Sequence, residues 1–163
     1  MRAAVLLLLA LAACGPRSEG RDVQAGLRLE QAALIAGLVP TVGGPLTGAW
    51  ARDGDRMCVA PPAAGQDEQR VGIVLDYGPG NGCVARGTAR RSGNEVAIDL
   101  GACRVQSRYD GGRIVFPTDL DDRCAPLCRG NATLSALRVE RVSDSGAEAL
   151  ALRSPAGRLL CSD

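Results

Sequence analysis

Residues 70–109 read RVGIVLDYGPGNGCVARGTARRSGNEVAIDLGACRVQSRY, and this stretch decides the fold of the chain. Apolar and polar side chains alternate along it, so that Val71, Ile73 and Leu75 fall on one face of an extended segment. Glycine-rich turns, the longest at 78–82, separate the alternating runs. Short period-two segments joined by tight turns are typical of strands that pair antiparallel in chain order. We therefore expect an antiparallel meander.

The same pattern of short apolar runs and turn residues continues on both sides of this stretch. Upstream, Asp53-Gly54-Asp55 is a hairpin-turn signal between two short apolar runs. Downstream, residues 118–130 predict a long irregular connection. Further strands are predicted at 50–52, 56–59, 113–116, 133–142, 148–153 and 158–161. About eight strands of this length predict a mainly β domain over residues 41–163, either a small antiparallel barrel or a two-sheet meander.

One helix is expected before the strands, over residues 22–40. Leu27, Ile35 and Leu38 lie on one side of it at helical spacing, and Pro40 stops its continuation. A helix lying on a membrane is the alternative. Its polar face holds a single arginine and no aromatic anchor, so we expect it to pack on the β domain instead.

The first residues have the pattern of a secretory signal. Arg2 precedes a short apolar run that is too short to span a membrane, and small residues follow it. The end of that run, Leu11-Ala12-Ala13-Cys14, resembles the lipobox of bacterial lipoprotein precursors. The resemblance implies that residues 1–13 are a signal peptide and that Cys14 is the lipid attachment site, with 14–21 as a tether. An ordinary signal peptide is the alternative.

The resemblance also implies a cellular location. The protein would be lipid-anchored in the bacterial cell envelope and face the periplasm. Gly15 follows Cys14 where retained lipoproteins carry aspartate, which favours the outer membrane over the inner one.

Setting Cys14 aside leaves an even number of cysteines. They are Cys58, Cys83, Cys103, Cys124, Cys128 and Cys161. In an exported chain this predicts three disulfides, whose pairing the sequence does not choose. Zinc is the weaker hypothesis because only Cys124 and Cys128 are closely spaced and the chain has no histidine.

The composition excludes several classes of catalyst. All 19 basic residues are arginine, and there is no lysine or histidine. This rules out Ser–His–Asp, Cys–His and Ser–Lys catalysis and Schiff-base chemistry. Carboxylate chemistry remains, with candidates at Asp53 and Asp55 and in the group Asp119, Asp121 and Asp122. We expect these aspartates to be turn residues and not a calcium site or a hydrolytic pair, and we expect no enzyme and no cofactor.

Charge gives little reason to expect nucleic acid as a partner. Loss of Arg2 with the signal brings the net charge from +1 to zero, and only four aromatic residues are available for stacking. A cationic patch is conceivable from the arginines at 86, 90, 91, 104, 108 and 113. Asp76, Glu95 and Asp99 are interleaved with them, so a mixed, solvated outer face is the expectation.

The β region also resembles known proteins. The segments Leu46-Thr-Gly-Ala-Trp50 to Cys58, Asp110-Gly-Gly-Arg-Ile-Val-Phe-Pro117 and Gly157-Arg-Leu-Leu-Cys161 resemble small uncharacterised lipoproteins of Gram-negative bacteria, which imply no activity. Gly48-Ala-Trp50 followed by Cys58 is more loosely similar to periplasmic inhibitors of proteases or lysozyme. We therefore expect an envelope binding or structural module with a membrane anchor and a possible envelope protein partner. An inhibitor of an exported protease or lysozyme is the alternative, and a carboxylate-dependent hydrolase comes third.

Overall fold

The computed structural model describes residues 19–36 and 44–162, and Cys14 lies outside them. The expected mainly β fold is confirmed. The strands are β1 (Gly48–Arg52), β2 (Asp55–Val59), β3 (Gln69–Asp76), β4 (Gly82–Ser92), β5 (Glu95–Leu100), β6 (Cys103–Tyr109), β7 (Arg113–Val115), β8 (Cys128–Arg129) and β9 (Arg138–Ser143). The meander predicted from residues 70–109 is formed by β3 to β6, because their alternating patterns and short turns specify antiparallel neighbours.

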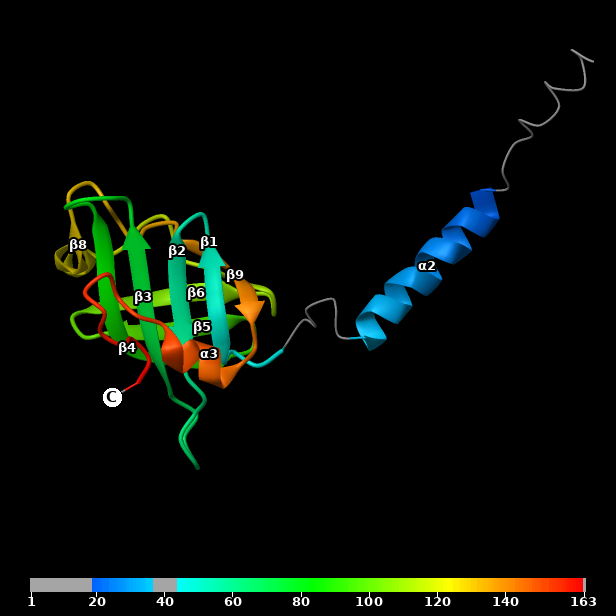
Figure 1. The fold of residues 1–163 in the computed structure, drawn as a ribbon, viewed down its shortest axis with the longest axis horizontal. Helices are drawn as coiled ribbons and strands as arrows, with labels where there is room; N and C mark the ends of the chain where they lie inside the picture. Colours follow the sequence, from blue (N-terminus) through cyan, green and yellow to red (C-terminus); the bar gives the residue numbers. More distant parts are fainter. Residues whose placement is uncertain (1–18, 37–43, 163) are drawn as a thin grey trace, which may run out of the picture. The chain divides into compact units, whose positions relative to one another are not determined.

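Eight of these strands close into a barrel (Figure 1). The sheet runs in the order β3-β2-β1-β9-β7-β6-β5-β4, and pairing of β3 with β4 closes it. Every pair is antiparallel. Strand β9 completes the circle because it pairs with both β1 and β7. Strand β8 is an addition that pairs with β4.

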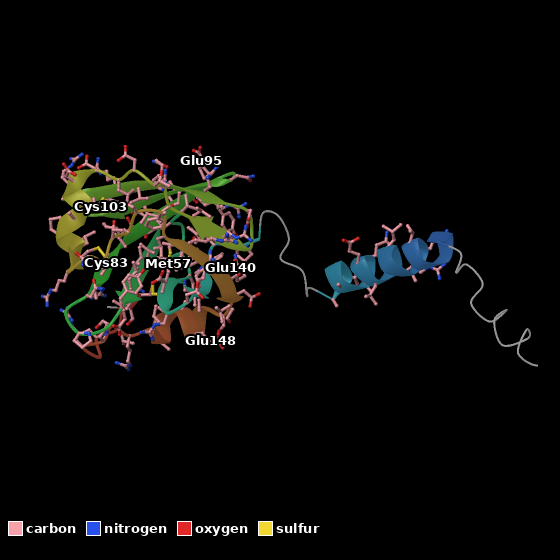
Figure 2. The ribbon with its side chains drawn as sticks, turned by 90° about the horizontal axis from the view of Figure 1, so that it is seen from above. Met57, Cys83, Glu95, Cys103, Glu140 and Glu148 are labelled. Atoms are coloured by element: carbon pink, nitrogen blue, oxygen red, sulfur yellow. A yellow bond between two sulfur atoms is a disulfide. The ribbon has the colours of Figure 1, made fainter. Side chains whose placement is uncertain are left out.

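Apolar side chains fill the interior of the barrel. Trp50, Met57, Ile73, Ile98 and Phe116 are each at most 2% exposed and belong to one core cluster. Strand β6 alternates strictly between buried and exposed residues, as a strand with one face on a core does. Figure 2 shows Met57 within the barrel and glutamates at its periphery. The inside is therefore a packed core, and ligand chemistry has to be sought on the outside.

The long connection 116–137 carries a short 3-10 helix, η2 (Asp122–Leu127), followed directly by β8. Asp121 caps η2 by accepting a hydrogen bond from the Arg123 backbone N–H at 2.9 Å. The strand predicted at 133–142 begins only at Arg138.

The strand predicted at 148–153 is wrong. The chain forms a short helix there, α3 (Gly146–Ala151), because the Ser145 hydroxyl accepts from the Glu148 N–H at 3.3 Å and caps its first turn. The Ser-Gly-Ala-Glu pattern and the alanines outweigh the alternation on which the strand prediction rested. The strand expected at 158–161 is reduced to a single bridge between Arg153 and Leu159.

After α3 the chain crosses the outer face of β3 and β4, where it is drawn in red in Figure 1. Leu160 and Cys161 of this segment pack against Cys58 and Val74 on the outside of the barrel. Together with Ala149 of α3 they form a second, smaller core. This outer core explains why β3 is buried on both faces between residues 71 and 75. We call residues 152–162 the C-terminal strap.

The remaining helix, α2 (Glu19–Ile35), belongs to a separate unit, residues 1–39, and the barrel belongs to residues 40–163. It begins three residues before the expected start, so Glu19-Gly-Arg21 of the predicted tether is helical. The expected packing of this helix on the β domain stays a prediction. Among the described residues, no helix is both long and apolar enough to cross a membrane.

Candidate functional site

Three disulfides tie peripheral segments to the barrel, as the cysteine count predicted. Cys83–Cys128 joins β4 to β8, Cys103–Cys124 joins β6 to η2, and Cys58–Cys161 joins β2 to the C-terminal strap. Each of the three therefore fastens a segment that lies outside the eight-stranded circle: β8, η2 and the C-terminal strap.

A groove of about 770 Å³ lies between these fastened segments. Its walls come from three parts of the chain: residues 75–84 of the β3–β4 hairpin, residues 126–129 of η2 and β8, and residues 154–158 of the C-terminal strap. A volume of this size is within the range of small-molecule sites. We call it the strap groove.

The hairpin wall is held by its own hydrogen bonds. The Gly78 N–H donates to Asp76 Oδ1 at 3.2 Å, and the Asn81 N–H donates to the Gly78 carbonyl at 3.0 Å. Asn81 Oδ1 accepts from the Asn131 N–H at 3.0 Å, which links this wall to the segment after β8. The turn is therefore fixed on both sides.

The strap wall is equally constrained. The Ser154 N–H donates to the Arg158 carbonyl at 2.8 Å, and the Gly157 N–H donates to the Ser154 carbonyl at 2.8 Å. Arg86 of β4 donates from Nε to the Leu160 carbonyl at 3.0 Å. Together with Cys161, these contacts hold the strap on the barrel.

The groove combines apolar surface with a small excess of positive charge. Val84, which is 38% exposed, and the rings of Pro79, Pro126 and Pro155 supply the apolar part. Three charged residues line the groove: Asp76, Arg129 and Arg158. All three are exposed, and no ion pair or side-chain hydrogen bond holds either guanidinium within residues 44–162.

Sequence reasoning missed this groove. Asp76, Arg129 and Arg158 lie far apart in the chain, and although Arg158 belongs to the segment Gly157-Arg-Leu-Leu-Cys161, nothing in that segment points to the other two. The only signal available was the position of Arg129 directly after Cys128. The tertiary structure alone brings the three together.

The predicted carboxylate candidates are not brought into one site. No pocket described for residues 44–162 is lined by both Asp53 or Asp55 and the 119–122 group. Among the described residues no three cysteine, aspartate or glutamate side chains form a cluster able to hold a metal. Asp121 instead pairs with the Arg123 side chain at 2.7 Å, and this contact holds the pKa of the Asp121 carboxyl well below its ordinary value.

Asp55 lies at the start of β2 and carries a carboxylate whose pKa is raised. Burial raises the pKa of Asp55, a hydrogen bond from Tyr77 opposes that rise, and the nearby Asp53 charge adds to it. Its Oδ1 is buried without a hydrogen-bond partner. Tyr77 is 50% exposed and follows β3 directly.

Most of the arginines considered for a cationic patch have internal partners. Arg104 pairs with Asp99 at 3.1 Å, and Arg113 pairs with Asp110 and Glu140. Arg86 and Arg91 donate to backbone carbonyls at the strap and at Gly44. The outer face is therefore mixed in charge, as the interleaved acidic residues indicated.

A second exposed feature is the loop between β2 and β3, which extends beyond the barrel in Figure 1. Residues 61–68 are all exposed. At the base of the loop, the buried Gln69 side chain donates from Nε2 to the Ala60 carbonyl at 2.8 Å and to Thr47 Oγ1 at 2.7 Å. A Cβ on Gly146 would lie 2.6 Å from Pro61 Cγ, so α3 packs closely against the first arm of the loop.

The fold and the groove together define a small, closed antiparallel barrel, fastened by disulfides, with its open concave surface on the outside. No protein-family model, curated protein or solved structure matches the chain.

Proposed function

We propose that this protein is an exported, lipid-anchored binding module of the bacterial envelope, and that its ligand sits in the strap groove. The observation that carries the proposal is the construction of the groove: three distant segments meet there, and disulfides through Cys128 and Cys161 fasten two of them. A rigid concave surface loses little conformational entropy on binding. The filled barrel interior offers no comparable space.

The envelope location is a proposal that rests on two features. The lipobox-like Leu11-Ala12-Ala13-Cys14 supplies an anchor, and three disulfides fit an oxidising compartment. We place the anchor in the outer membrane, with the protein facing the periplasm. Acyl chains on Cys14 would hold the protein there, because each buried methylene contributes about 0.8 kcal/mol.

Site-specific photo-crosslinking in cells tests the groove as the binding surface. Ala156 in the groove is replaced by the photoreactive residue benzoylphenylalanine, and Ala102, exposed in the turn after β5, receives the same replacement as a matched control. The cells are irradiated, the protein is purified, and its intact mass is measured by mass spectrometry. We expect one discrete added mass at position 156 and none at 102. No added mass at 156, or the same masses at both positions, overturns the proposal.

Inhibition of an exported protease or lysozyme is the second candidate, and the loop 61–68 favours it. The loop projects from the barrel, carries small residues at Ala63 and Ala64, and turns through a hydrogen bond from the Gln66 N–H to the Ala63 carbonyl at 3.0 Å. A projecting segment with a braced base suits insertion into the cleft of another protein.

Stoichiometric inhibition assays distinguish this candidate from groove binding. The full chain is mixed at equal concentration with each of a panel of secreted proteases and lysozymes, beside an Ala64→Glu variant and the control Ala102→Glu. The candidate predicts that one enzyme is inhibited and that only Ala64→Glu relieves the inhibition. It is abandoned if the whole panel keeps its activity.

A further inference from the structure

Two guanidinium groups of the strap groove have no partner within the described part of the barrel. Arg129 comes from β8 and Arg158 from the C-terminal strap, and both line the groove. An arginine fork is built to bind a carboxylate or a phosphate through two parallel hydrogen bonds. Two such forks that line one groove from different parts of the chain are suited to an anion.

The two groove arginines differ from other exposed arginines of the described barrel that also lack a partner, such as Arg56 and Arg90, because both line one groove. Arg104 and Arg113 are ion-paired, and Arg86 is engaged by the strap carbonyls. Arg129 and Arg158 instead line a groove whose walls also carry proline rings and Val84. The ligand therefore needs both a negative group and a compact apolar body.

The third charge in the groove limits how much negative charge the ligand carries. Asp76 contributes one carboxylate, held in the turn by its contact with the Gly78 N–H. Two guanidinium groups against one carboxylate leave a single positive charge. A singly charged anion balances it, whereas a doubly charged phosphate monoester meets additional repulsion from Asp76.

The main chain that carries the two arginines is fixed before any ligand arrives. Arg129 follows the disulfide-bonded Cys128, and Arg158 lies three residues before Cys161, which is bonded to Cys58. The Arg158 backbone is also closed into a turn with Ser154. Fixed backbones reduce the entropy lost when the side chains converge on one anion.

We propose that the strap groove binds a small organic carboxylate with a compact apolar body, held between Arg129 and Arg158. This inference rests on the proposed function, because it names the chemistry of the ligand that the groove receives. It assigns Arg129 and Arg158 to the carboxylate, and Val84 with the proline rings to the apolar body.

Titration with three matched probes tests the proposal. Cyclohexanecarboxylate, cyclohexyl phosphate and the neutral cyclohexanecarboxamide share one apolar body and differ in charge. Each is added to the purified full chain, and the amide chemical shifts of the barrel are followed by NMR. We expect the carboxylate to shift groove resonances with a Kd of about 1 mM, as suits so small a ligand. The carboxamide is expected to bind about tenfold more weakly.

Three variants assign the effect to the groove charges. Arg129→Met together with Arg158→Met is expected to weaken carboxylate binding about tenfold while leaving the carboxamide unchanged. The control, Arg56→Met with Arg90→Met, removes the same charge from exposed positions outside the groove and is expected to bind as the parent does. Asp76→Asn, which keeps the side-chain oxygen that caps the turn, is expected to tighten carboxylate binding.

Each outcome has one meaning. Carboxylate and carboxamide binding equally in the groove overturns the charge assignment and leaves the proposed groove function standing. Equal weakening by the groove pair and the control pair also overturns it, because only net charge then matters. Tighter binding of the phosphate than of the carboxylate overturns the preference for a single charge. No shift with any probe, together with no photo-adduct at Ala156, overturns the inference and the proposed function together.

Discussion

The guanidinium of Arg141 lies 4.1 Å from the centroid of the Trp50 ring and covers one face of the only tryptophan in the chain. Arg141 also donates to the carbonyls of Thr47 at 3.0 Å and Gly111 at 3.2 Å and to the Tyr109 hydroxyl at 2.8 Å. One arginine from β9 thus joins the segment before β1 to the turn before β7. It stabilises the junction of β9 with β1 and β7.

Replacement of Arg141 by methionine is expected to lower the free energy of unfolding by about 2–4 kcal/mol. The substitution keeps much of the side-chain volume but removes the cation from the Trp50 ring and leaves several carbonyl groups short of a donor. Arg141→Lys is expected to recover less than half, because an ammonium lacks the planar fork. Urea unfolding followed by circular dichroism measures all three proteins.

Arg113→Met is the matched control for this prediction. Arg113 makes only partly exposed ion pairs, at 3.6 Å to Asp110 and 3.5 Å to Glu140, so its removal is expected to cost about 1 kcal/mol. Similar losses for Arg113→Met and Arg141→Met would contradict a special role for the contact with Trp50.

Gly72→Ala is expected to loosen the C-terminal strap. A Cβ at this position would lie 2.5 Å from Leu160 Cβ and 3.0 Å from Cys58 Sγ, so the strap has to move outward. Overpacking of this kind costs about 1–3 kcal/mol. Trypsin cleavage after the exposed Arg158 is expected to accelerate. Val84→Ala, on the outer face of the neighbouring strand, is the control, and equal cleavage rates in the two variants would argue against the contact.

The disulfides are expected to differ in what they contribute. Cys58–Cys161 closes a separation of 103 residues, whereas Cys103–Cys124 closes 21. In the chain-entropy model, removing the first pair by Cys→Ala at both positions costs about 5 kcal/mol and removing the second about 3 kcal/mol. Urea denaturation of the two double variants measures the difference. The reverse order would mean that strap contacts, and not loop closure, dominate.

Asp55 is expected to make the protein less stable as the pH rises. Because burial raises the pKa of Asp55 in the folded chain, the folded state holds its proton to a higher pH than the unfolded state, whose value is near 3.8. The contribution of Asp55 to the free energy of unfolding is therefore fully present below the unfolded pKa. It is lost as the pH rises through the folded pKa. Unfolding free energies measured from acidic to neutral pH are expected to fall more steeply in the parent than in Asp55→Asn.

Tyr77→Phe gives the same prediction a second readout. The hydrogen bond from Tyr77 lowers the pKa of Asp55, so its loss raises that pKa further and moves the fall in stability to higher pH. Identical pH profiles for the parent, Asp55→Asn and Tyr77→Phe would show that this carboxyl does not control the profile.

Much of the barrel was predictable from local pattern. Val71 and Ile73 are buried as their alternation indicated, because a strand's side-chain period is fixed and the short turns leave consecutive strands no other neighbours. The error at 148–153 was local too, since the Ser145 cap and its Glu148 partner were visible in the chain but were outweighed by an apparent alternation. The even cysteine count predicted three disulfides and nothing about their partners.

The amino-acid sequence by itself determined the antiparallel meander of β3 to β6, the inward-facing residues of those strands and the absence of imidazole and lysine chemistry, because these depend on residue types and on spacings of a few positions. Only the tertiary structure decided that β9 closes the barrel between β1 and β7, which cysteines pair, and that Asp76, Arg129 and Arg158 line one groove. Contacts between residues dozens of positions apart depend on how the whole barrel packs, and no local pattern carries that information.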